Sequence, residues 1–255
     1  MSADSGETSE DAVLGGKLVL RQPRRGHRFG HDAILLAASV AALSGERAVE
    51  LGAGVGAAGL ALASRVDGLD VTLVDLNPTL TALAGENIER NGLSDRMRAV
   101  GLDVGAQASA FAAAGLAFGS VDHVLMNPPF NAAQNPSPDR VRRMAHVASD
   151  ATLGQWLGAA ARLLRPAGVV TLIWRADGLG DVLTALAVDF GAIAVLPIHG
   201  KLGSPAIRVV VRAAKDRNSP LVLLPGFVLA DAEGKPTVAA ETVLRDGAAL
   251  SLAQN

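Results

Sequence analysis

The chain has 255 residues, of which 49% are hydrophobic, enough to bury one large core or two modest ones. Its formal net charge is −2 and its isoelectric point is near 6.2, which excludes a polycation that binds nucleic acid over its whole surface. It contains no cysteine, which excludes disulfides and thiolate metal sites and fits a reducing cytoplasm.

The N-terminal segment is polar. Its first dozen residues show no hydrophobic pattern but carry four acids, Asp4, Glu7, Glu10 and Asp11. We therefore expect residues 1–12 to form a disordered acidic tail. A short strand is expected at Lys17–Leu20 and a helix at Ala33–Leu43, with Asp32 as its N-cap. This helix is too short to cross a bilayer and follows a long polar stretch, so we expect no membrane span, no signal peptide and a cytoplasmic location.

Strands and helices then alternate along the chain. The expected strands are Arg47–Leu51, Val71–Asp75, Met97–Leu102, Val121–Met126, Val169–Trp174, Ile193–Leu196 and Ile207–Val211. The expected helices are Ala57–Arg65, Thr79–Asn91, Gln107–Ala117, Thr152–Leu164 and Leu179–Phe190. Such alternation with short connections predicts a doubly wound, Rossmann-like α/β fold with a seven-stranded, mostly parallel sheet and helices on both faces.

We expect one domain over residues 13–255, because the pattern shows no internal repeat and no second boundary. Within it, residues 13–45 would form an N-terminal cap that contacts substrate. Residues 220–255 would add a hairpin and a short helix after the last strand.

A glycine-rich turn follows the first strand of the alternation in the segment VELGAGVGAAGLALA, residues 49–63. Gly52, Gly54 and Gly56 let the backbone turn tightly and approach a ligand, and the helix that follows offers free N–H groups and a positive dipole end. Asp75 ends the next strand about 20 residues further on, where a carboxylate can bind two ribose hydroxyls. The pattern indicates a nucleoside site.

Two kinds of nucleotide fit this pattern. Gly54, Gly56 and Gly59 form a literal G-x-G-x-x-G, and with Asp75 they would suit an NAD-dependent oxidoreductase.

Three features favour a different ligand. Glu50 precedes the glycines, where a pyrophosphate disfavours a carboxylate but a cationic ligand end tolerates one. Asp103 follows the third strand, placed to accept a hydrogen bond from an adenine amino group. The fourth strand ends in Asn127, Pro128, Pro129 and Phe130, which serve no purpose in hydride transfer.

With these residues in place, the chain resembles the class I S-adenosylmethionine-dependent methyltransferases. More narrowly, it is similar to the bacterial tRNA methyltransferases that modify adenine N6 beside the anticodon of a valine tRNA. The similarity rests on the segments QPRRGHRFGHDAILLAA, E-x-G-x-G-x-G, VDLNP, ENIERNGL, MNPPF, IHGKLGSPAIRVVVRAAKD and PTVAAETVLRDG.

The resemblance implies S-adenosyl-L-methionine as cofactor, and its NPPF motif implies a planar nitrogen as methyl acceptor. Adenine N6 in tRNA is the expected target. A protein glutamine amide or a small-molecule N- or O-acceptor on the same fold remains an alternative. The cofactor would be bound by Glu50, Gly52, Gly54, Gly56, Asp75, Asp103 and Asn127.

The resemblance also assigns the catalytic turn. The side-chain oxygen of Asn127 and the carbonyl of Pro128 would accept the two hydrogens of the acceptor amine and point its lone pair at the methyl group. Pro128 and Pro129 would make the turn rigid, and Phe130 would stack on a base taken out of its stack.

Basic residues in two segments are candidates for contacts with tRNA phosphates. They are Arg24, Arg25 and Arg28, beside Phe29, and Arg140, Arg142 and Arg143 after NPPF. His31 beside the helix start could cover the cofactor, but a lone histidine there is more often structural. His146 has no assigned role, and Trp156 is interpreted as packing. No His, Asp or Glu cluster has metal-ligand spacing, so we expect no metal. The oligomeric state is not predicted.

Overall fold

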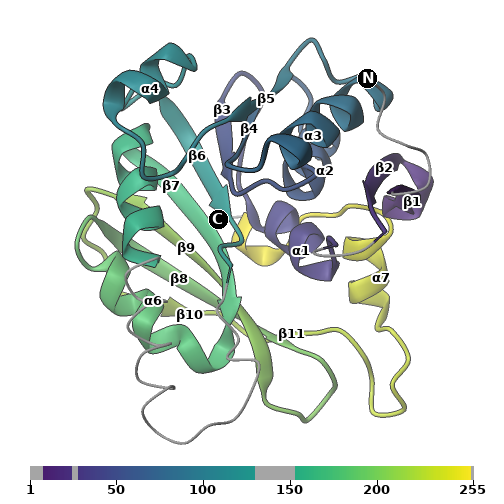
Figure 1. Cartoon of the computed structure of the whole chain (residues 1–255). Coiled ribbons are helices and arrows are strands. Elements are labelled where there is room, and N and C mark those ends of the chain that lie inside the picture. The colour runs from purple at the N-terminus through teal and green to yellow at the C-terminus, as the bar shows by residue number, and fades with distance from the viewer. Residues whose placement is uncertain (1–7, 25–27, 130–152, 254–255) are drawn as a thin grey trace, which may run out of the picture.

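A central sheet separates two layers of helices (Figure 1), in a computed structural model that describes residues 8–24, 28–129 and 153–253. One apolar core lies on each face: Leu35, Leu60 and Ile88 belong to the first, and Phe111 and Leu157 to the second. The expected α/β class with a mostly parallel, doubly wound sheet is confirmed.

Within the described residues, the main sheet has nine strands in the order β10-β8-β9-β7-β6-β3-β4-β5, with β11 beside β8. Neighbouring strands are parallel except that β9 runs antiparallel to β7 and β8. The long strands are β3 (Arg47–Leu51), β4 (Asp70–Asp75), β5 (Met97–Gly101), β6 (Val121–Met126), β7 (Leu164–Arg175), β8 (Phe190–His199) and β9 (Ala206–Lys215). Two short strands, β10 (Val222–Leu223) and β11 (Phe227–Val228), extend the expected seven to nine.

The helices cover the sheet on both sides. The first face carries α1 (His31–Ser39), α2 (Ala57–Arg65) and α3 (Pro78–Arg90). The second carries α4 (Ala108–Ala113), a helix over residues 153–163, and α6 (Leu179–Leu186). The other helices of the described residues are α7 (Val238–Leu244) and the short helices η1 (Leu14–Gly16), η2 (Ala176–Gly178) and η3 (Ser251–Ala253). Helix α3 starts at Pro78, one residue before the predicted Thr79, because Asn77 caps it by accepting hydrogen bonds from the Thr79 and Leu80 N–H groups.

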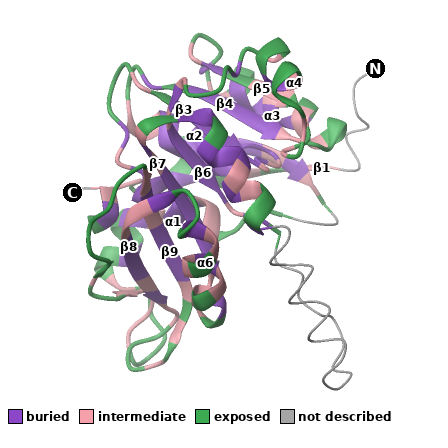
Figure 2. Ribbon diagram, turned by 90° about the vertical axis from the view of Figure 1, so that its left-hand side faces the viewer, coloured by how far each residue is buried: buried purple, intermediate pink, exposed green. Residues whose placement is uncertain are grey.

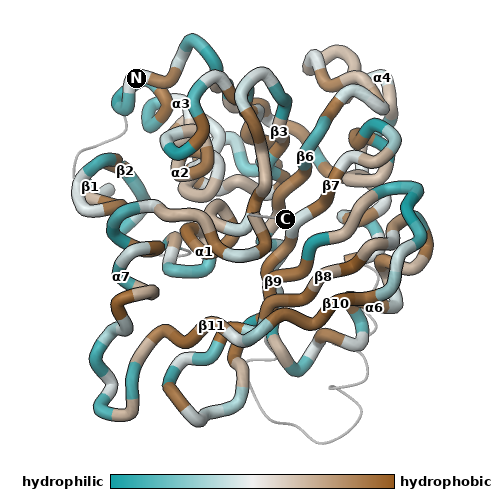
Figure 3. The backbone as a smooth tube through the Cα atoms, turned by 180° about the vertical axis from the view of Figure 1, so that it is seen from behind, coloured by the Kyte–Doolittle hydropathy of each residue, from teal (hydrophilic) through white to brown (hydrophobic). Residues whose placement is uncertain are grey.

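The central strands are buried because helices cover both of their faces. Figure 2 shows the buried residues concentrated on the strands and the exposed ones on loops and outer helix surfaces. Figure 3 shows the matching hydropathy, with hydrophobic residues along β7, β8 and β9. Near-continuous apolar runs of this kind are expected for strands that face no solvent.

The expectation of a disordered tail is wrong for residues 8–12. They belong to a two-stranded antiparallel sheet made of β1 (Thr8–Val13) and β2 (Leu18–Pro23). Two of its acidic side chains form ion pairs at the surface, since Asp11 lies 2.9 Å from Arg28 and Glu10 lies 2.8 Å from Arg90. Residues 1–7 lie outside the described ranges.

Helix α1 begins earlier than expected, and Asp32 is not its N-cap. Gly30 occupies that position without a side-chain hydrogen bond. Asp32 lies in the first turn and binds Arg208 of β9, with 2.8 Å between Oδ2 and Nε. The carboxylate thus ties the helix to the sheet, a long-range contact that a capping pattern does not reveal.

The boundaries around β7 also differ from expectation. Helix 153–163 is followed directly by β7, so Pro166 and Gly168 lie inside the strand bounds instead of in a loop. The pairing of β6 with β7 shifts register between Val121 and His123, and Ala167 has φ of 63°. These are the features of a bulge, which accommodates a proline and a glycine without ending the strand.

The C-terminal segment forms only a small part of the expected hairpin. Within the described residues, one antiparallel bridge joins Ala230 and Pro236, and the Asp231 N–H donates to the Lys235 carbonyl at 2.9 Å. The strands β10 and β11 instead pair parallel with β8. Thr237 caps α7 by accepting a hydrogen bond from the Ala240 N–H at 3.0 Å, so the expected short helix is present.

Candidate active site

The strand order reverses between β3 and β6, and the candidate site lies at the carboxyl ends of these strands. Leu51, the last residue of β3, is the register partner of both Val74 in β4 and Met126 in β6. Gly52, Asp75 and Asn127 each come directly after one of these partners, so the register sets them side by side at one edge. Ligands of open α/β sheets bind in the crevice at such a switch point.

Two glycines of the turn are required by close packing, and the third leaves the backbone open to a ligand. Gly52, Gly54 and Gly56 have φ of 66°, 57° and 86°, a region that favours glycine. A Cβ on Gly52 would overlap the indole of Trp156, and one on Gly56 would lie 2.6 Å from Leu73. A Cβ on Gly54 would meet nothing within 4 Å, so at this glycine the backbone faces open space.

Asp75 closes the glycine turn from the next strand. Its Oδ2 accepts a hydrogen bond from the Gly54 N–H at 2.7 Å, and its Oδ1 accepts one from the Asn77 N–H at 2.8 Å. Each carboxylate oxygen keeps a second acceptor site. The next residue, Leu76, is 69% exposed, and it offers an apolar surface beside the carboxylate.

Replacing Asp75 by alanine is expected to weaken cofactor binding by about 1.5–3 kcal/mol, the range for a hydrogen bond to a charged group. Because Gly54 would also lose its partner, we expect a loss of stability of about 1 kcal/mol. Titration calorimetry with S-adenosylhomocysteine measures the affinity. Asp70→Ala, at the opposite end of β4, is the control, and equal affinities of both variants would contradict the role of Asp75.

Glu50 lies beneath the turn rather than in its opening. Glu50 is 4% exposed, and its Oε2 accepts a hydrogen bond from the Gly59 N–H of α2 at 2.7 Å. Burial raises the pKa of this carboxyl from its ordinary 4.5 to about 8, the Gly59 N–H opposes the rise, and the charge of Asp75 adds to it. Glu50 thus satisfies an N–H in the first turn of α2. Its direct contact with the cofactor stays a prediction.

Glu50→Gln is expected to change how stability depends on pH. Between pH 4.5 and 8 the unfolded chain releases the Glu50 proton while the folded chain keeps it, so the parent loses stability as pH rises. The loss approaches about 1.4 kcal/mol per pH unit within that window, and the Gln variant lacks it. Urea unfolding at several pH values should show that, relative to the parent, the free energy of unfolding of the variant increases from pH 5 to pH 8. Parallel stability curves would contradict the raised pKa.

Asp103 lies at the same edge, after β5. It is exposed, and its Oδ1 accepts a hydrogen bond from the Gly105 N–H at 2.7 Å, which forms a tight turn. A Cβ on Gly105 would overlap the side-chain amide of Gln155 on helix 153–163. The predicted contact of Asp103 with an adenine amino group is not tested by this geometry.

The turn after β6 presents an amide. Asn127 is half-buried, Pro128 is buried and Pro129 is exposed. No hydrogen bond joins the Asn127 carboxamide to any described residue, so its donors and acceptor are available to a ligand. Phe130, Arg140, Arg142 and Arg143 lie outside the described residues, as does Arg25.

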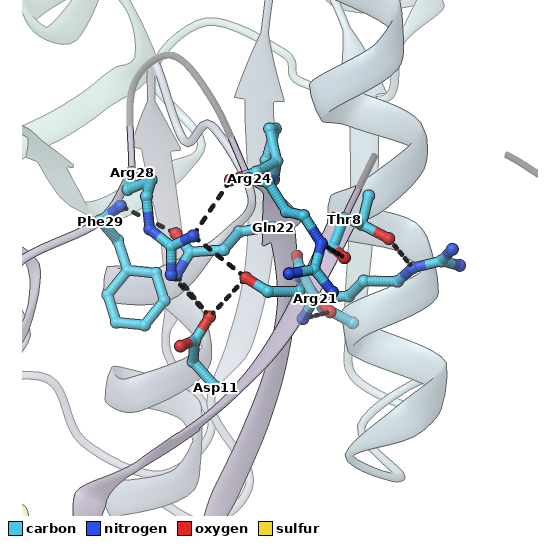
Figure 4. Close-up of polar contacts among 10 residues, drawn as sticks. Thr8, Asp11, Arg21, Gln22, Arg24, Arg28 and Phe29 are labelled. Atoms are coloured by element: carbon cyan, nitrogen blue, oxygen red, sulfur yellow. Dashed lines mark hydrogen bonds and ion pairs between the residues drawn. The ribbon is translucent and has the colours of Figure 1, made fainter. Parts of the chain in front are cut away.

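The N-terminal arginines are engaged within the chain (Figure 4). Arg28 binds Asp11 and also donates to Ser9 Oγ at 3.1 Å, and Arg24 Nε donates to the Thr8 carbonyl at 2.9 Å. The Gln22 side chain donates to Asp11 at 2.8 Å, and this bond, with those from Ser9 and Arg28, lowers the pKa of Asp11 despite the opposing effect of burial.

Phe29 is half-buried, and its N–H donates to Gln22 at 3.2 Å. Arg24 and Arg28 thus bind residues of β1 and stabilise the β1–β2 hairpin. Their predicted contact with RNA is untested.

Three features of this edge were not predicted. Trp156, interpreted as ordinary packing, packs across the backbone of the glycine turn. Arg175, the last residue of β7, is the register partner of Arg208 in β9, and it lies three residues beyond Leu172, the partner of Met126 at the end of β6. Their only sequence signal is that each lies near a strand end.

No described helix has the length and apolar character to cross a membrane. Within the described ranges, no group of three or more His, Cys, Asp or Glu side chains could hold a metal ion.

The antiparallel β9 between β7 and β8 gives the strand order of the class I methyltransferases that use S-adenosyl-L-methionine, and solved structures of such enzymes share this fold. The family model of the methyltransferase small domain matches residues 29–196 of this sequence. The chain therefore belongs to that family. The chain is therefore a methyltransferase, and the oxidoreductase alternative is set aside.

Named relatives differ in substrate. The tRNA1(Val) (adenine(37)-N6)-methyltransferase of Tolumonas auensis is 28% identical over 67% of this chain and 68% of its own length. The enzyme of the same name from Phocaeicola vulgatus is 28% identical over 72% of this chain and 75% of its own length. The release factor glutamine methyltransferase of Chlorobaculum tepidum is 32% identical over 60% of this chain, a match that spans only 54% of that enzyme.

Solved structures agree on the fold. A protein described as a predicted O-methyltransferase from Agrobacterium tumefaciens is 26% identical, with a TM-score of 0.73, over 86% of this chain and 98% of that one. TrmN from Thermus thermophilus, at 22% identity and a TM-score of 0.52, covers 72% of this chain and 48% of its own and shows the fold alone.

The cofactor of this family is S-adenosyl-L-methionine, and the site fits it. The open backbone at Gly54 admits a close approach, Asp75 has acceptor sites for ribose hydroxyls, and Leu76 offers an apolar surface for a nucleobase. When bound, the cofactor supplies a methyl group on a positively charged sulfur.

Proposed function

We propose that the protein methylates the exocyclic N6 of an adenine in tRNA. The observation that carries this proposal is the Asn127 carboxamide, which has no hydrogen bond to the described residues and follows β6 beside the glycine turn. An enzyme that acts on a hydroxyl has no need of a carboxamide at this place, whereas a planar amine requires an acceptor for each of its hydrogens.

The amine of adenine is a weak nucleophile because its lone pair is delocalised into the ring. The Asn127 side-chain oxygen and the Pro128 carbonyl would accept its two hydrogens and favour a tetrahedral nitrogen. Pro128 and Pro129 restrict the backbone, so these acceptors are oriented before the substrate arrives. Orientation of this kind supplies much of the acceleration when the electrophile is already strong.

Two observations support tRNA as the acceptor. Relatives from Tolumonas auensis and Phocaeicola vulgatus carry that activity in their names. Arg175 and Arg208 are register partners on β7 and β9 near this edge of the sheet, and guanidinium groups there would suit phosphate oxygens. Arg175 lies 3.3 Å from the Asp177 carboxylate and Arg208 lies 2.8 Å from the Asp32 carboxylate, and these acids limit the local positive charge.

A glutamine side chain in a protein is the second candidate. Its amide nitrogen is also planar and carries two hydrogens, so Asn127 would bind it in the same way. The relative from Chlorobaculum tepidum, a release factor glutamine methyltransferase, supports this alternative.

A transfer assay with methyl-labelled S-adenosylmethionine distinguishes the two acceptors. The purified protein is incubated with tRNA from a strain that lacks the gene and, separately, with the release factors of that strain. Label recovered as N6-methyladenosine after nucleoside digestion is the expected result. The control is tRNA from the parent strain, which should accept less label because its sites are already methylated.

Label in glutamine of a release factor, with none in tRNA, would replace the proposed substrate and keep the chemistry. Binding of S-adenosylhomocysteine without transfer to either acceptor would contradict both candidates.

A further inference from the structure

Strand β2 has β1 on one side and helix α3 on the other. The side chain of Asn91 accepts from the Val19 N–H and donates to the Val19 carbonyl, both at 2.9 Å. The side chain of Asn87 accepts from the Arg21 N–H at 2.7 Å and donates to the Arg21 carbonyl at 3.0 Å. Residues i and i+4 share one helix face, and the backbone groups of strand residues i and i+2 point to the same edge, so the two carboxamides take the place of a neighbouring strand along β2.

The two asparagines differ in their second N–H. Asn91 donates its second hydrogen to the Asn87 carbonyl at 2.7 Å, a contact at the end of α3 itself. Asn87 donates its second hydrogen to the carbonyl of Val55 at 3.0 Å, which lies between Gly54 and Gly56. Asn87 is fully buried, and with this bond all the hydrogens of its amide are used.

The bond to Val55 completes the support of the glycine turn. The Gly54 N–H is held by Asp75, and the Gly56 N–H by the Ala53 carbonyl at 2.8 Å. Asn87 holds the carbonyl between them. A turn with three glycines has wide conformational freedom. Each such bond reduces the number of conformations open to the turn, and so reduces the entropy lost when the cofactor binds.

We infer that Asn87 is a positioning residue that couples the docking of the β1–β2 hairpin to the conformation of the cofactor turn. The inference rests on the cofactor and is independent of whether the acceptor is tRNA or protein. Its physical basis is that one buried carboxamide, that of Asn87, hydrogen-bonds both Arg21 in the hairpin and Val55 in the glycine turn. Disorder in either segment would leave polar groups of this buried amide unpaired.

The chain provides a matched pair of variants for the test. Asn87→Ala and Asn91→Ala each remove two hydrogen bonds to β2, but only the first also frees the Val55 carbonyl. Calorimetry with S-adenosylhomocysteine gives affinity, and urea unfolding gives stability. We expect both variants to be destabilised, and Asn87→Ala to bind the ligand about 3- to 10-fold more weakly than Asn91→Ala, as expected for the loss of one hydrogen bond. Equal affinities of the two variants would overturn the inference.

Hydrogen exchange on the parent provides a test if Asn87→Ala does not fold. Coupling is reciprocal, so saturation with S-adenosylhomocysteine should slow exchange of the Arg21 amide, bound by Asn87, more than that of the Val19 amide, bound by Asn91. Equal slowing at both amides would overturn the coupling. A parent that does not bind the ligand would contradict the cofactor assignment instead, so the two failures are distinguishable.

Discussion

Asn127→Ala is expected to lower the rate of methyl transfer by about 100- to 1,000-fold, the typical effect of removing one preorganised group that acts in the transition state. The Asn127 oxygen would bind the acceptor nitrogen most strongly as that nitrogen becomes tetrahedral, so the loss falls on kcat. Asn127 lies after β6, and the groups expected to bind the nucleoside lie after β3, β4 and β5. Asn127 is expected to contact the cofactor only at its methyl-bearing end, which S-adenosylhomocysteine lacks, so affinity for that ligand should remain close to that of the parent.

Single-turnover kinetics with saturating cofactor measure this effect. The matched control is Asn218→Ala, because Asn218 is exposed and its Cα lies close to Gly191 at the start of β8, away from the carboxyl ends of β3 and β6. Equal rates for Asn127→Ala and the parent would show that the turn after β6 does not carry the chemistry.

Gly52→Ala is expected to destabilise the protein by about 2–6 kcal/mol. A positive φ at a non-glycine residue costs about 1–3 kcal/mol, and overpacking adds about 1–3 kcal/mol. Both apply here, because Gly52 has φ of 66° and a Cβ would overlap the Trp156 indole. Urea unfolding measures the change. Gly54→Ala should show only the penalty for positive φ, because Gly54 has φ of 57° and a Cβ there would lie in open space.

A double variant isolates the contact between the two residues. In a Trp156→Ala background the overlap is absent, so the penalty of Gly52→Ala should fall to that measured for Gly54→Ala. A penalty that stays the same in both backgrounds would mean that Trp156 does not constrain the glycine turn.

Local patterns were sufficient where an element is determined by its own residues. The bounds of β3, α2 and β6 agree with those expected from sequence, because apolar runs bounded by glycine or proline signals define them. The three glycines and Asp75 were placed at one edge for the same reason, since strand ends of a parallel sheet meet there.

The missed elements depend on distant residues. Strand β1 was expected to be disordered, yet its partner β2 is held by Asn91, 72 residues from Val19. The two-residue strands β10 and β11 exist through their pairing with the edge of β8. The burial of Glu50 under α2 follows from helix packing, which a strand pattern does not encode.

The central claim is that the carboxyl ends of β3, β4 and β6 bind S-adenosylmethionine with its methyl group directed at the Asn127 turn. A crystal structure of the protein with S-adenosylhomocysteine tests it most directly. We expect the ribose hydroxyls within hydrogen-bond distance of the Asp75 carboxylate, the ligand against the Gly54 backbone, and its sulfur facing Asn127. A ligand bound elsewhere, or bound here with Asp75 still contacting only Gly54 and Asn77, would contradict the account.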